Sequence, residues 1–215
     1  MLCEAYVDQL DTALAAEQNG AGRLELCGPG EGGLTPSPEL LRAVLNAVRV
    51  PVHVMIRPRT GDFVYSAAEF AAMREGIALA QTQGAAGVVF GFTHPDGTLD
   101  LTRMAALVAL ARPLRVGIHR AFDQAPDPDE ALDQVIALGI DLVLTAGHAP
   151  SAEEGIATLA RLQQRAAGRT VILAGGGVRA PNVQRILRET GVPEVHARAS
   201  DPEVFAAVVR AARAA

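Results

Sequence analysis

The 215-residue sequence contains no lysine, and all 19 of its basic residues are arginine. This absence excludes catalysis through a lysine Schiff base or a lysine nucleophile. The 24 acidic residues outnumber the basic ones, which gives a formal charge of -5 and an isoelectric point near 5.5. A chain with no basic surplus lacks the electrostatic footprint of a nucleic-acid binder. We therefore predict no nucleic-acid partner.

Long apolar runs are also absent, and cysteine is scarce. No stretch reaches the roughly 20 apolar residues of a membrane-spanning helix. The first residues lack the basic and apolar regions of a secretion signal. We therefore predict a cytoplasmic protein without a membrane partner, in which Cys3 and Cys27 are thiols rather than a disulfide. Their spacing matches no zinc motif.

The chain is predicted to form a single domain over residues 1–215. Nearly half of its residues are apolar, and it contains no linker or low-complexity segment. A chain of this length fits one large α/β domain, because neither half alone would bury much core.

Short strands and amphipathic helices alternate along the whole sequence. Four predicted helices end at a glycine that a strand follows closely, namely Gly20, Gly84, Gly139 and Gly191. The predicted strands cover residues 2–8, 23–27, 52–57, 88–91, 114–119, 141–145, 170–174 and 194–198. Helix start signals occur at Ser37-Pro38, Ser66 with Glu69, Asp127-Pro128, Ser151 with Glu154, Pro181 and Asp201-Pro202.

This alternation predicts parallel strands, in either a closed (β/α)8 barrel or a doubly wound open sheet. The strands of an open sheet are covered by helices on both faces and are apolar throughout. Here one phase of the strands is apolar, with examples in Val52, Val54 and the pair Leu142 and Leu144, whereas the other phase is often polar. The apolar phase is expected to face the helices, so we predict a single TIM-type barrel with a polar interior.

The predicted interior contains several charged residues, whose burial is costly unless they pair with one another or contact a ligand. Its members are Glu4, Tyr6, Asp8, Glu25, Cys27, His53, Met55, Arg57, His119, Thr145, His196 and Arg198. Glu4, Glu25 and His53 lie low in the barrel, where a role confined to specifying the fold is an alternative to a functional one.

Ligands of TIM barrels bind at the C-terminal ends of the strands. There, Gly175, Gly176 and Gly177 follow a strand and precede a helix, so their backbone amides are candidate anion ligands. Arginines in the same set of loops would add charge and paired donors. The candidates are Arg57, Arg59, Arg120 and Arg179.

Two further chemistries are open at this end of the barrel. His119 and Asp123, or Glu25, are candidate acid–base groups for an enzyme. A thiol, a thioether and an imidazole are the donors that Cu(I) prefers, and Cys27, Met55 and His119 offer them on inward-facing positions. Cys3 has the opposite phase and is expected to face the helices.

Several motifs resemble the copper homeostasis protein CutC family, and together they extend over nearly the whole chain. They are Arg23-Leu-Glu-Leu-Cys27, Gly32-Gly-Leu-Thr-Pro-Ser37, Pro51-Val-His-Val-Met-Ile-Arg-Pro-Arg59, Gly61-Asp-Phe63 with Tyr65, Gly87-Val-Val-Phe-Gly91, His119-Arg-Ala-Phe-Asp123, Gly175-Gly-Gly-Val-Arg179 and Glu194-Val-His-Ala197.

The resemblance implies a cytoplasmic TIM-type barrel, often a homodimer or larger oligomer, that handles copper and binds Cu(I) through cysteines. Many relatives carry a cysteine in the first strand where this chain has Tyr6, so only Cys27 matches the proposed pair. Copper handling is therefore one hypothesis. The other is an enzyme or binding protein for a small metabolite that bears a phosphate or carboxylate. A barrel whose polar interior only specifies the fold is the third reading.

Overall fold

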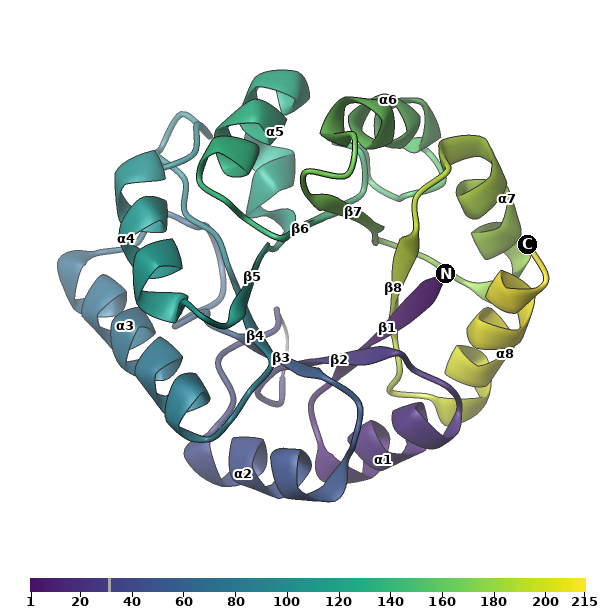
Figure 1. The fold of residues 1–215 in the computed structure, drawn as a ribbon, viewed down its shortest axis with the longest axis horizontal. Coiled ribbons are helices and arrows are strands. Elements are labelled where there is room, and N and C mark those ends of the chain that lie inside the picture. The colour runs from purple at the N-terminus through teal and green to yellow at the C-terminus, as the bar shows by residue number, and fades with distance from the viewer. Residues whose placement is uncertain (31) are drawn as a thin grey trace.

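The computed structural model describes residues 1–30 and 32–215, in which eight strands and eight α-helices alternate (Figure 1). The elements are β1 (Leu2–Val7), α1 (Leu10–Gln18), β2 (Arg23–Leu26), α2 (Pro38–Ala47), β3 (Val52–Met55), α3 (Ala67–Thr82), β4 (Gly87–Phe90), α4 (Leu101–Ala111), β5 (Arg115–Ile118), the 3-10 helix η1 (Arg120–Gln124), α5 (Pro128–Ala137), β6 (Leu142–Thr145), α6 (Ile156–Ala166), β7 (Val171–Ala174), α7 (Ala180–Thr190), β8 (Glu194–Arg198) and α8 (Pro202–Arg213).

The strands form a closed, all-parallel barrel. Each strand pairs with its sequence neighbours, and β8 pairs with β1, which closes the sheet. Around β1, Glu4 is in register with Arg23 on one side and with His196 on the other. The helices form an outer ring (Figure 1). The predicted (β/α)8 barrel is thus confirmed, and the open sheet is excluded.

On most strands, the residues predicted to face the helices and those predicted to face the barrel interior do so. The main core lies between the barrel and the helices and includes Ala5, Leu24, Val54 and Val116, as the apolar phase requires. Cys3 also belongs to this outer core. Tyr6, Cys27, Met55 and Val89 form a separate cluster inside the barrel. The alternation of apolar and polar residues was therefore sufficient to orient these strands.

The prediction for β6 was wrong. Leu142 and Leu144 point into the barrel, where they cluster with Leu173, and Val143 faces the helices instead. Thr145, predicted to lie inside, donates a hydrogen bond to Asp123 of η1. The error has a simple cause: β6 has apolar residues in both phases, so its sequence contains no alternation that could reveal its orientation.

Most helix starts follow their predicted caps. Ser66 and Glu69 form a capping box on α3, and Ser37, Asp127 and Asp201 cap α2, α5 and α8 with their side chains. The start predicted at Ser151 was early, because α6 begins at Ile156. Ser151 instead stabilises a preceding turn through hydrogen bonds with Glu154.

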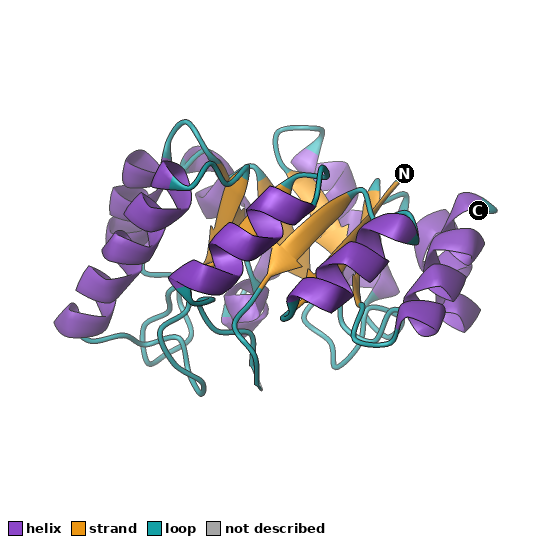
Figure 2. Cartoon of the chain, turned by 90° about the horizontal axis from the view of Figure 1, so that it is seen from below, coloured by secondary structure: helices purple, strands orange, loops and turns teal. Residues whose placement is uncertain are grey.

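The two ends of the barrel differ in the length of their loops (Figure 2). At the C-terminal ends of the strands, long connections cover residues 27–37, 56–66, 91–100 and 146–155, whereas the opposite connections are as short as residues 112–114 and 191–193. Longer loops with room for side chains therefore gather at the barrel mouth, the end formed by the C-terminal ends of the strands.

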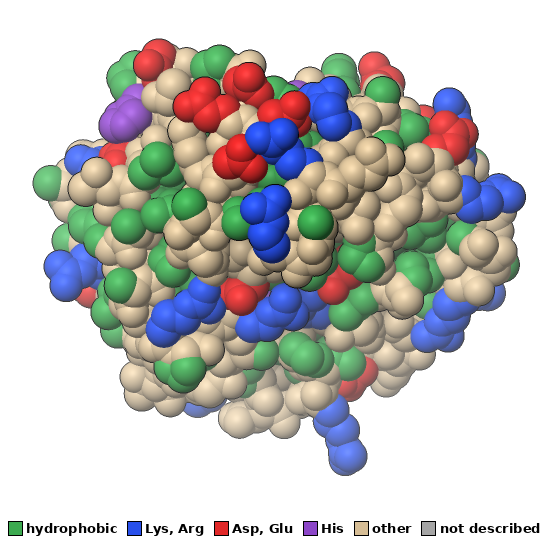
Figure 3. All heavy atoms as spheres, turned by 45° about the horizontal axis from the view of Figure 1, so that its top comes forward, with side chains coloured by type: hydrophobic (Ala, Val, Ile, Leu, Met, Phe, Trp, Pro, Cys, Tyr) green, Lys and Arg blue, Asp and Glu red, His purple; other side chains and the backbone are tan. Residues whose placement is uncertain are grey.

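The outer surface is chemically mixed. On the face shown in Figure 3, acidic and basic side chains are interspersed, and apolar ones are scattered. Phe205 and Val208 of α8 are buried, and only Val204 of that apolar face is exposed. Among the described residues, no helix combines the length and apolar character needed to cross a bilayer.

Gly87 of β4 tests how tightly the barrel floor is packed. A β-carbon on Gly87 would lie 2.6 Å from His53 Cδ2 and 2.8 Å from the Arg115 carbonyl oxygen. Because that oxygen belongs to the backbone, we expect Gly87→Ala to lower the free energy of unfolding by about 1–3 kcal/mol. Urea denaturation measures the change. Ala86→Ser, at an exposed neighbouring position, is the control and should stay within about 0.5 kcal/mol of the wild type.

Candidate functional site

A network of buried charges spans the floor of the barrel. Arg23 of β2 forms an ion pair with Glu4 of β1 and a second one, at 2.6 Å, with Glu194 of β8. His196 Nδ1 lies 2.7 Å from the other carboxylate oxygen of Glu4. Glu4 is fully buried, yet each of its oxygens has a cationic or donating partner. The parallel register of β1, β2 and β8 produces this arrangement by placing Arg23 and His196 on either side of Glu4.

The network fixes the charge states of its members. Burial alone would raise the pKa of Glu4, but the hydrogen bond from His196 and the charge of Arg23 outweigh it and hold the pKa at about 2. Burial works against a charged His196, but Glu25 and Glu4 raise its pKa above the ordinary value. Glu4 is therefore an anion at neutral pH and favours an imidazolium beside it.

Glu25 lies at the junction between this network and the cavity above it. Its Oε2 atom is 3.8 Å from His196 Nε2 and 3.9 Å from the Cys27 sulfur, whereas Oε1 has no hydrogen-bond partner among the described residues. Burial raises the pKa of Glu25 to about 7, against the attraction of His196. A carboxyl group with this pKa can both take and give a proton near neutral pH.

Above Glu25 the mouth contains a cavity of about 200 Å³. Its walls come from β1, β2, β3, β6 and β8 and from the segments that follow β2, β3 and β5, and they include Tyr6, Glu25, Gly32, Gly33, Met55, Arg57, Phe63, His119, Arg120, Leu144 and Arg198. Four buried polar atoms of these residues, Tyr6 Oη, Glu25 Oε1, Arg57 Nε and His119 Nε2, lack a hydrogen-bond partner within the described part of the chain. Buried polar atoms are normally satisfied, so their convergence on one cavity indicates a ligand site.

His119 and Asp123 do not form the expected acid–base pair. The Nδ1 atom of His119 accepts a hydrogen bond from the Ala121 amide, and burial, followed by the charge of Arg57, lowers the pKa of His119 to about 3. Asp123 accepts hydrogen bonds from Arg120, at 2.8 Å, and from Thr145. Asp123 therefore orients Arg120 and the loop after β6, while His119 faces the cavity as a neutral imidazole.

A second cavity, of about 230 Å³, adjoins the first and shares Tyr6, Arg120, Leu144 and Arg198 with it. It is also lined by Gly176, Gly177, Val178, Arg179, His196 and Ala197. Gly175 donates its amide to the Thr145 carbonyl, but within residues 1–30 and 32–215 the amides of Gly176, Gly177 and Val178 donate to no acceptor. Free amides beside three arginines suit an anion.

The two remaining predicted arginines differ in their placement. Arg57 lines the first cavity, where it donates to the carbonyls of Gly32 and Gly61 and stacks on Phe63. Arg59 lies outside both cavities, and its guanidinium is held by Glu69, Asp62 and the Val64 carbonyl. Its role is to fold the loop before α3.

Cys27 and Met55 come together inside the barrel, as predicted for two soft metal donors. They follow the register pair Leu26 and Val54 on adjacent strands and share one cluster with Tyr6. The Cys27 thiol is fully buried, and burial, followed by the charges of Glu25 and Glu4, raises its pKa well above the ordinary value. His119 lines the same cavity as Met55.

A different set of residues offers harder ligands. Glu4, Glu25 and His196 place one ligand atom each within 4.8 Å of one another, and no other group of three or more His, Cys, Asp or Glu side chains in the described ranges does so. Glu4 is already paired with Arg23 and His196, so a cation at this position would have to compete with those contacts. The arrangement is therefore better suited to holding a proton than a metal ion.

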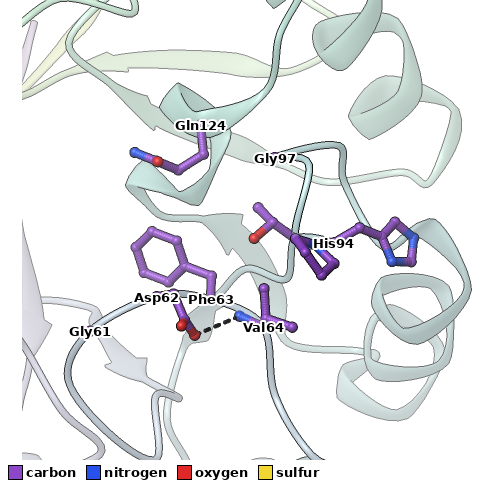
Figure 4. Close-up of a pocket in the computed structure, with 9 residues that line it drawn as sticks. Gly61, Asp62, Phe63, Val64, His94, Gly97 and Gln124 are labelled. Atoms are coloured by element: carbon purple, nitrogen blue, oxygen red, sulfur yellow. Dashed lines mark hydrogen bonds between the residues drawn. The ribbon is translucent and has the colours of Figure 1, made fainter.

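A third cavity, of about 370 Å³ and thus larger than the other two, lies beside the mouth and shares Phe63 with the first cavity (Figure 4). Asp62, His94 and Gln124 contribute its polar groups, and all three side chains are exposed. None of the unpartnered buried atoms lies in its lining. The unpartnered polar atoms that could bind a ligand therefore line the smaller cavities and not this one.

A closed parallel (β/α)8 barrel with an ionisable, arginine-rich mouth defines a TIM-barrel protein. The CutC family model matches residues 1–201, and the chain belongs to the CutC family. The copper homeostasis protein cutC homolog of Mus musculus is 48% identical over 92% of this chain and 73% of its own length. The homolog of Homo sapiens is 47% identical over the same shares of the two chains.

Solved structures agree with this assignment. The copper homeostasis protein CutC of Streptococcus agalactiae superposes with a TM-score of 0.86 at 32% identity, over 91% of this chain and 97% of that one. The phosphoribosylanthranilate isomerase of Thermotoga maritima superposes with a TM-score of 0.68 at 12% identity, over the full length of both chains. The similarity to this isomerase shows a shared fold alone.

Sequence reasoning placed Tyr6, His196 and Arg198 in the barrel interior but assigned them no role at the site. His196 links Glu4 to Glu25, and Arg198 stacks on the Tyr6 ring, with 4.6 Å between its guanidinium carbon and the ring centroid. The sequence signal that could have found them was their position on the inward-facing phase of their strands. Leu144 and Phe63 were missed because β6 lacks alternation and Phe63 lies in an irregular loop.

The raised pKa of Glu25 makes stability depend on pH. The unfolded chain loses this proton near the ordinary pKa of 4.5, whereas the folded chain keeps it to about pH 7. The contribution to stability is therefore full below pH 4.5 and is lost as the pH rises through 7. The measured quantity is the free energy of unfolding of Glu25→Gln minus that of the wild type. Between pH 4.5 and pH 8 we expect this difference to move in favour of the variant by on the order of 2 kcal/mol, because only the wild type loses the contribution of Glu25.

Urea denaturation across this pH range measures the effect. Glu75→Gln, on the exposed face of α3, is the matched control, and its difference from the wild type should not change with pH. A pH-independent difference for Glu25→Gln would contradict the raised pKa.

Proposed function

We propose that the barrel mouth binds a small metabolite that carries a phosphate or carboxylate group. The convergence of unpartnered buried polar atoms on one cavity carries this proposal. Tyr6 Oη is a donor, and His119 Nε2 is one as well, because its Nδ1 already accepts from Ala121. These hydrogen-bond donors outnumber the one acceptor group, the carboxyl of Glu25. The favoured ligand is therefore rich in acceptor oxygens.

The adjoining cavity supports an anionic end on that ligand. The amides of Gly176, Gly177 and Val178 lead into the N-terminus of α7, whose dipole favours negative charge. Arg120 approaches this loop, since a β-carbon on Gly176 would lie 3.4 Å from its Nη1 atom. The two cavities share four wall residues, so one molecule can extend its polar body over Glu25 and its anionic group towards Gly176.

Arg198 offers a test because it lines both cavities and its side chain has no ion pair or hydrogen bond in the part of the chain that the structure describes. We expect inorganic phosphate to raise the melting temperature of the wild type and to bind in calorimetry. Arg198→Gln should weaken this binding about 10-fold or more, the usual effect of losing one charged hydrogen bond.

Arg210→Gln, at an exposed position on α8, removes the same charge far from the mouth and should bind phosphate as the wild type does. Potassium chloride at equal ionic strength controls for screening. Equal responses to phosphate and chloride, or equal losses in the two variants, would overturn the proposal.

Cu(I) handling is the second candidate function, favoured by the clustering of Cys27 with Met55. A thiolate and a thioether suit Cu(I), and the nearby carboxyl groups of Glu25 and Glu4 would stabilise a cation there. The names of the mouse and human relatives point in the same direction. Both cysteines are free thiols, which agrees with a reducing cytoplasmic location.

An anaerobic Cu(I) titration against a strong chelator tests this candidate. We expect one-to-one binding that is lost in Cys27→Ser and weakened in Met55→Leu, since leucine keeps the volume but removes the sulfur. Cys3→Ser is the matched control, because Cys3 lies on the helix side of β1. Binding that survives in Cys27→Ser, or disappears in Cys3→Ser, would contradict a site at Cys27.

A further inference from the structure

We infer that the mouth catalyses a proton shift in a phosphorylated hydroxycarbonyl compound, with Glu25 as the base and His119 as the neutral donor to the carbonyl oxygen. This inference rests on the proposed metabolite-binding function and adds a reaction class to it. It depends on the placement of three groups: a carboxyl oxygen with no partner, an uncharged imidazole across the same cavity, and an anion site beside them.

Glu25 has the position that a base requires. It is 2% exposed, yet it lines the first cavity, and its Oε1 atom has no protein partner within the described ranges. The opposite oxygen faces His196 and Cys27. One face of the carboxyl group is therefore held by the barrel, and the other is presented to whatever occupies the cavity.

His196 and Glu4 are positioning residues for this base. The hydrogen bond between His196 Nδ1 and Glu4 turns Nε2 towards Glu25, and Arg23 fixes Glu4 from below. An imidazolium beside Glu25 stabilises its ionised form. The network thereby holds Oε2 of Glu25 on the barrel side and leaves Oε1 directed to the cavity.

His119 has the form needed to donate to a carbonyl oxygen. Its Nδ1 atom accepts from the Ala121 amide, so the single proton of the neutral ring is on Nε2, which has no protein acceptor in residues 1–30 and 32–215. Burial holds this ring neutral. A neutral imidazole can stabilise a developing oxyanion by hydrogen bonding, and Arg57 lines the same cavity as a nearby positive charge.

The reaction is balanced without an external oxidant or reductant. Glu25 Oε1 takes the proton from a carbon next to the carbonyl, and the electrons of that C–H bond form the C=C bond of an enediolate, whose oxygen receives the Nε2 proton of His119. His119 then takes the proton of the neighbouring hydroxyl group, whose carbon becomes the new carbonyl carbon, and so returns to its neutral form. Glu25 returns its proton to the other carbon, so the product is an isomer of the substrate.

The adjoining cavity determines the substrate class. Gly176, Gly177 and Val178 present free amides there, and Arg120, Arg179 and Arg198 surround them. A phosphate group can use more of these donors than a carboxylate can, because it carries three terminal oxygens and up to two negative charges. The favoured substrate therefore has a phosphate group separated from its hydroxycarbonyl group by a short carbon chain.

Solvent deuterium exchange tests this inference. Wild-type protein in D2O is incubated with dihydroxyacetone phosphate or ribulose 5-phosphate, and proton NMR follows deuterium incorporation at the carbons next to the carbonyl. We expect catalysed exchange that Glu25→Gln lowers by about 100-fold or more, while calorimetry shows binding within a few-fold of the wild type. Glu75→Gln is the matched control and should exchange at the wild-type rate.

The contrast between rate and binding separates the role of His196 from a purely structural one. The titratable or charged groups near Glu25 are Glu4 and Tyr6 on β1, Arg23 on β2, Cys27 directly after β2, His53 on β3, His196 and Arg198 on β8, and Arg57 and His119 across the cavity. Because His196 holds one oxygen of Glu25, His196→Gln should lower the exchange rate by about 10-fold or more, while phosphate-ester binding stays within a few-fold of the wild type. An unchanged exchange rate, or an equal loss of rate and binding, would overturn the positioning role.

The remaining outcomes distinguish the two proposals. A phosphate ester that binds but shows no exchange above the buffer rate, or equal exchange by Glu25→Gln, would overturn the reaction and leave the binding function intact. Failure of both phosphate esters and inorganic phosphate to bind would overturn both. Equal exchange of unphosphorylated dihydroxyacetone would overturn the assignment of the phosphate group to the second cavity.

Discussion

The burial of opposite charges inside the barrel is the constraint on which the rest of the site depends. Glu4 cannot remain ionised without water unless its oxygens are paired, and Arg23 and His196 supply those partners from the two strands that flank β1. Glu25 has only distant contacts, at 3.8 Å to His196 and 3.9 Å to the Cys27 sulfur. The network therefore leaves one carboxyl group incompletely neutralised, directly beneath the cavity at the barrel mouth.

The barrel interior is divided into two chemically different halves. β1, β2, β3 and β8 supply the ionisable groups, the thiol and the thioether, whereas β6 and β7 fill their side with Leu142, Leu144 and Leu173. The leucines lower the local dielectric and thereby strengthen the electrostatic interactions of the polar half. The same division explains why both cavities share Leu144 as one wall and Tyr6 as another.

The two candidate functions use overlapping groups, so they are not independent. The Cys27 sulfur lies 3.9 Å from Glu25, and a Cu(I) ion on Cys27 would change the charge that Glu25 experiences. Tyr6 lines both cavities and stacks beneath Arg198. Its hydroxyl adds a donor for an oxygen-rich ligand and no ligand for a soft metal. This hydroxyl group therefore supports the proposed metabolite binding more than the proposed copper binding.

The sequence by itself determined the barrel, the order of its elements, most helix caps and the family, because strand alternation, capping residues and contiguous motifs are local signals. It also placed Glu25, Cys27, Met55 and His119 inside. Only the tertiary structure decided which of these groups meet. The pairing of Glu4 with Arg23 and His196, the diversion of Asp123 and Arg59 to loop contacts, and the inward turn of Leu144 all depend on strand register and barrel closure. Those are relations between distant segments, and no local pattern in the sequence encodes them.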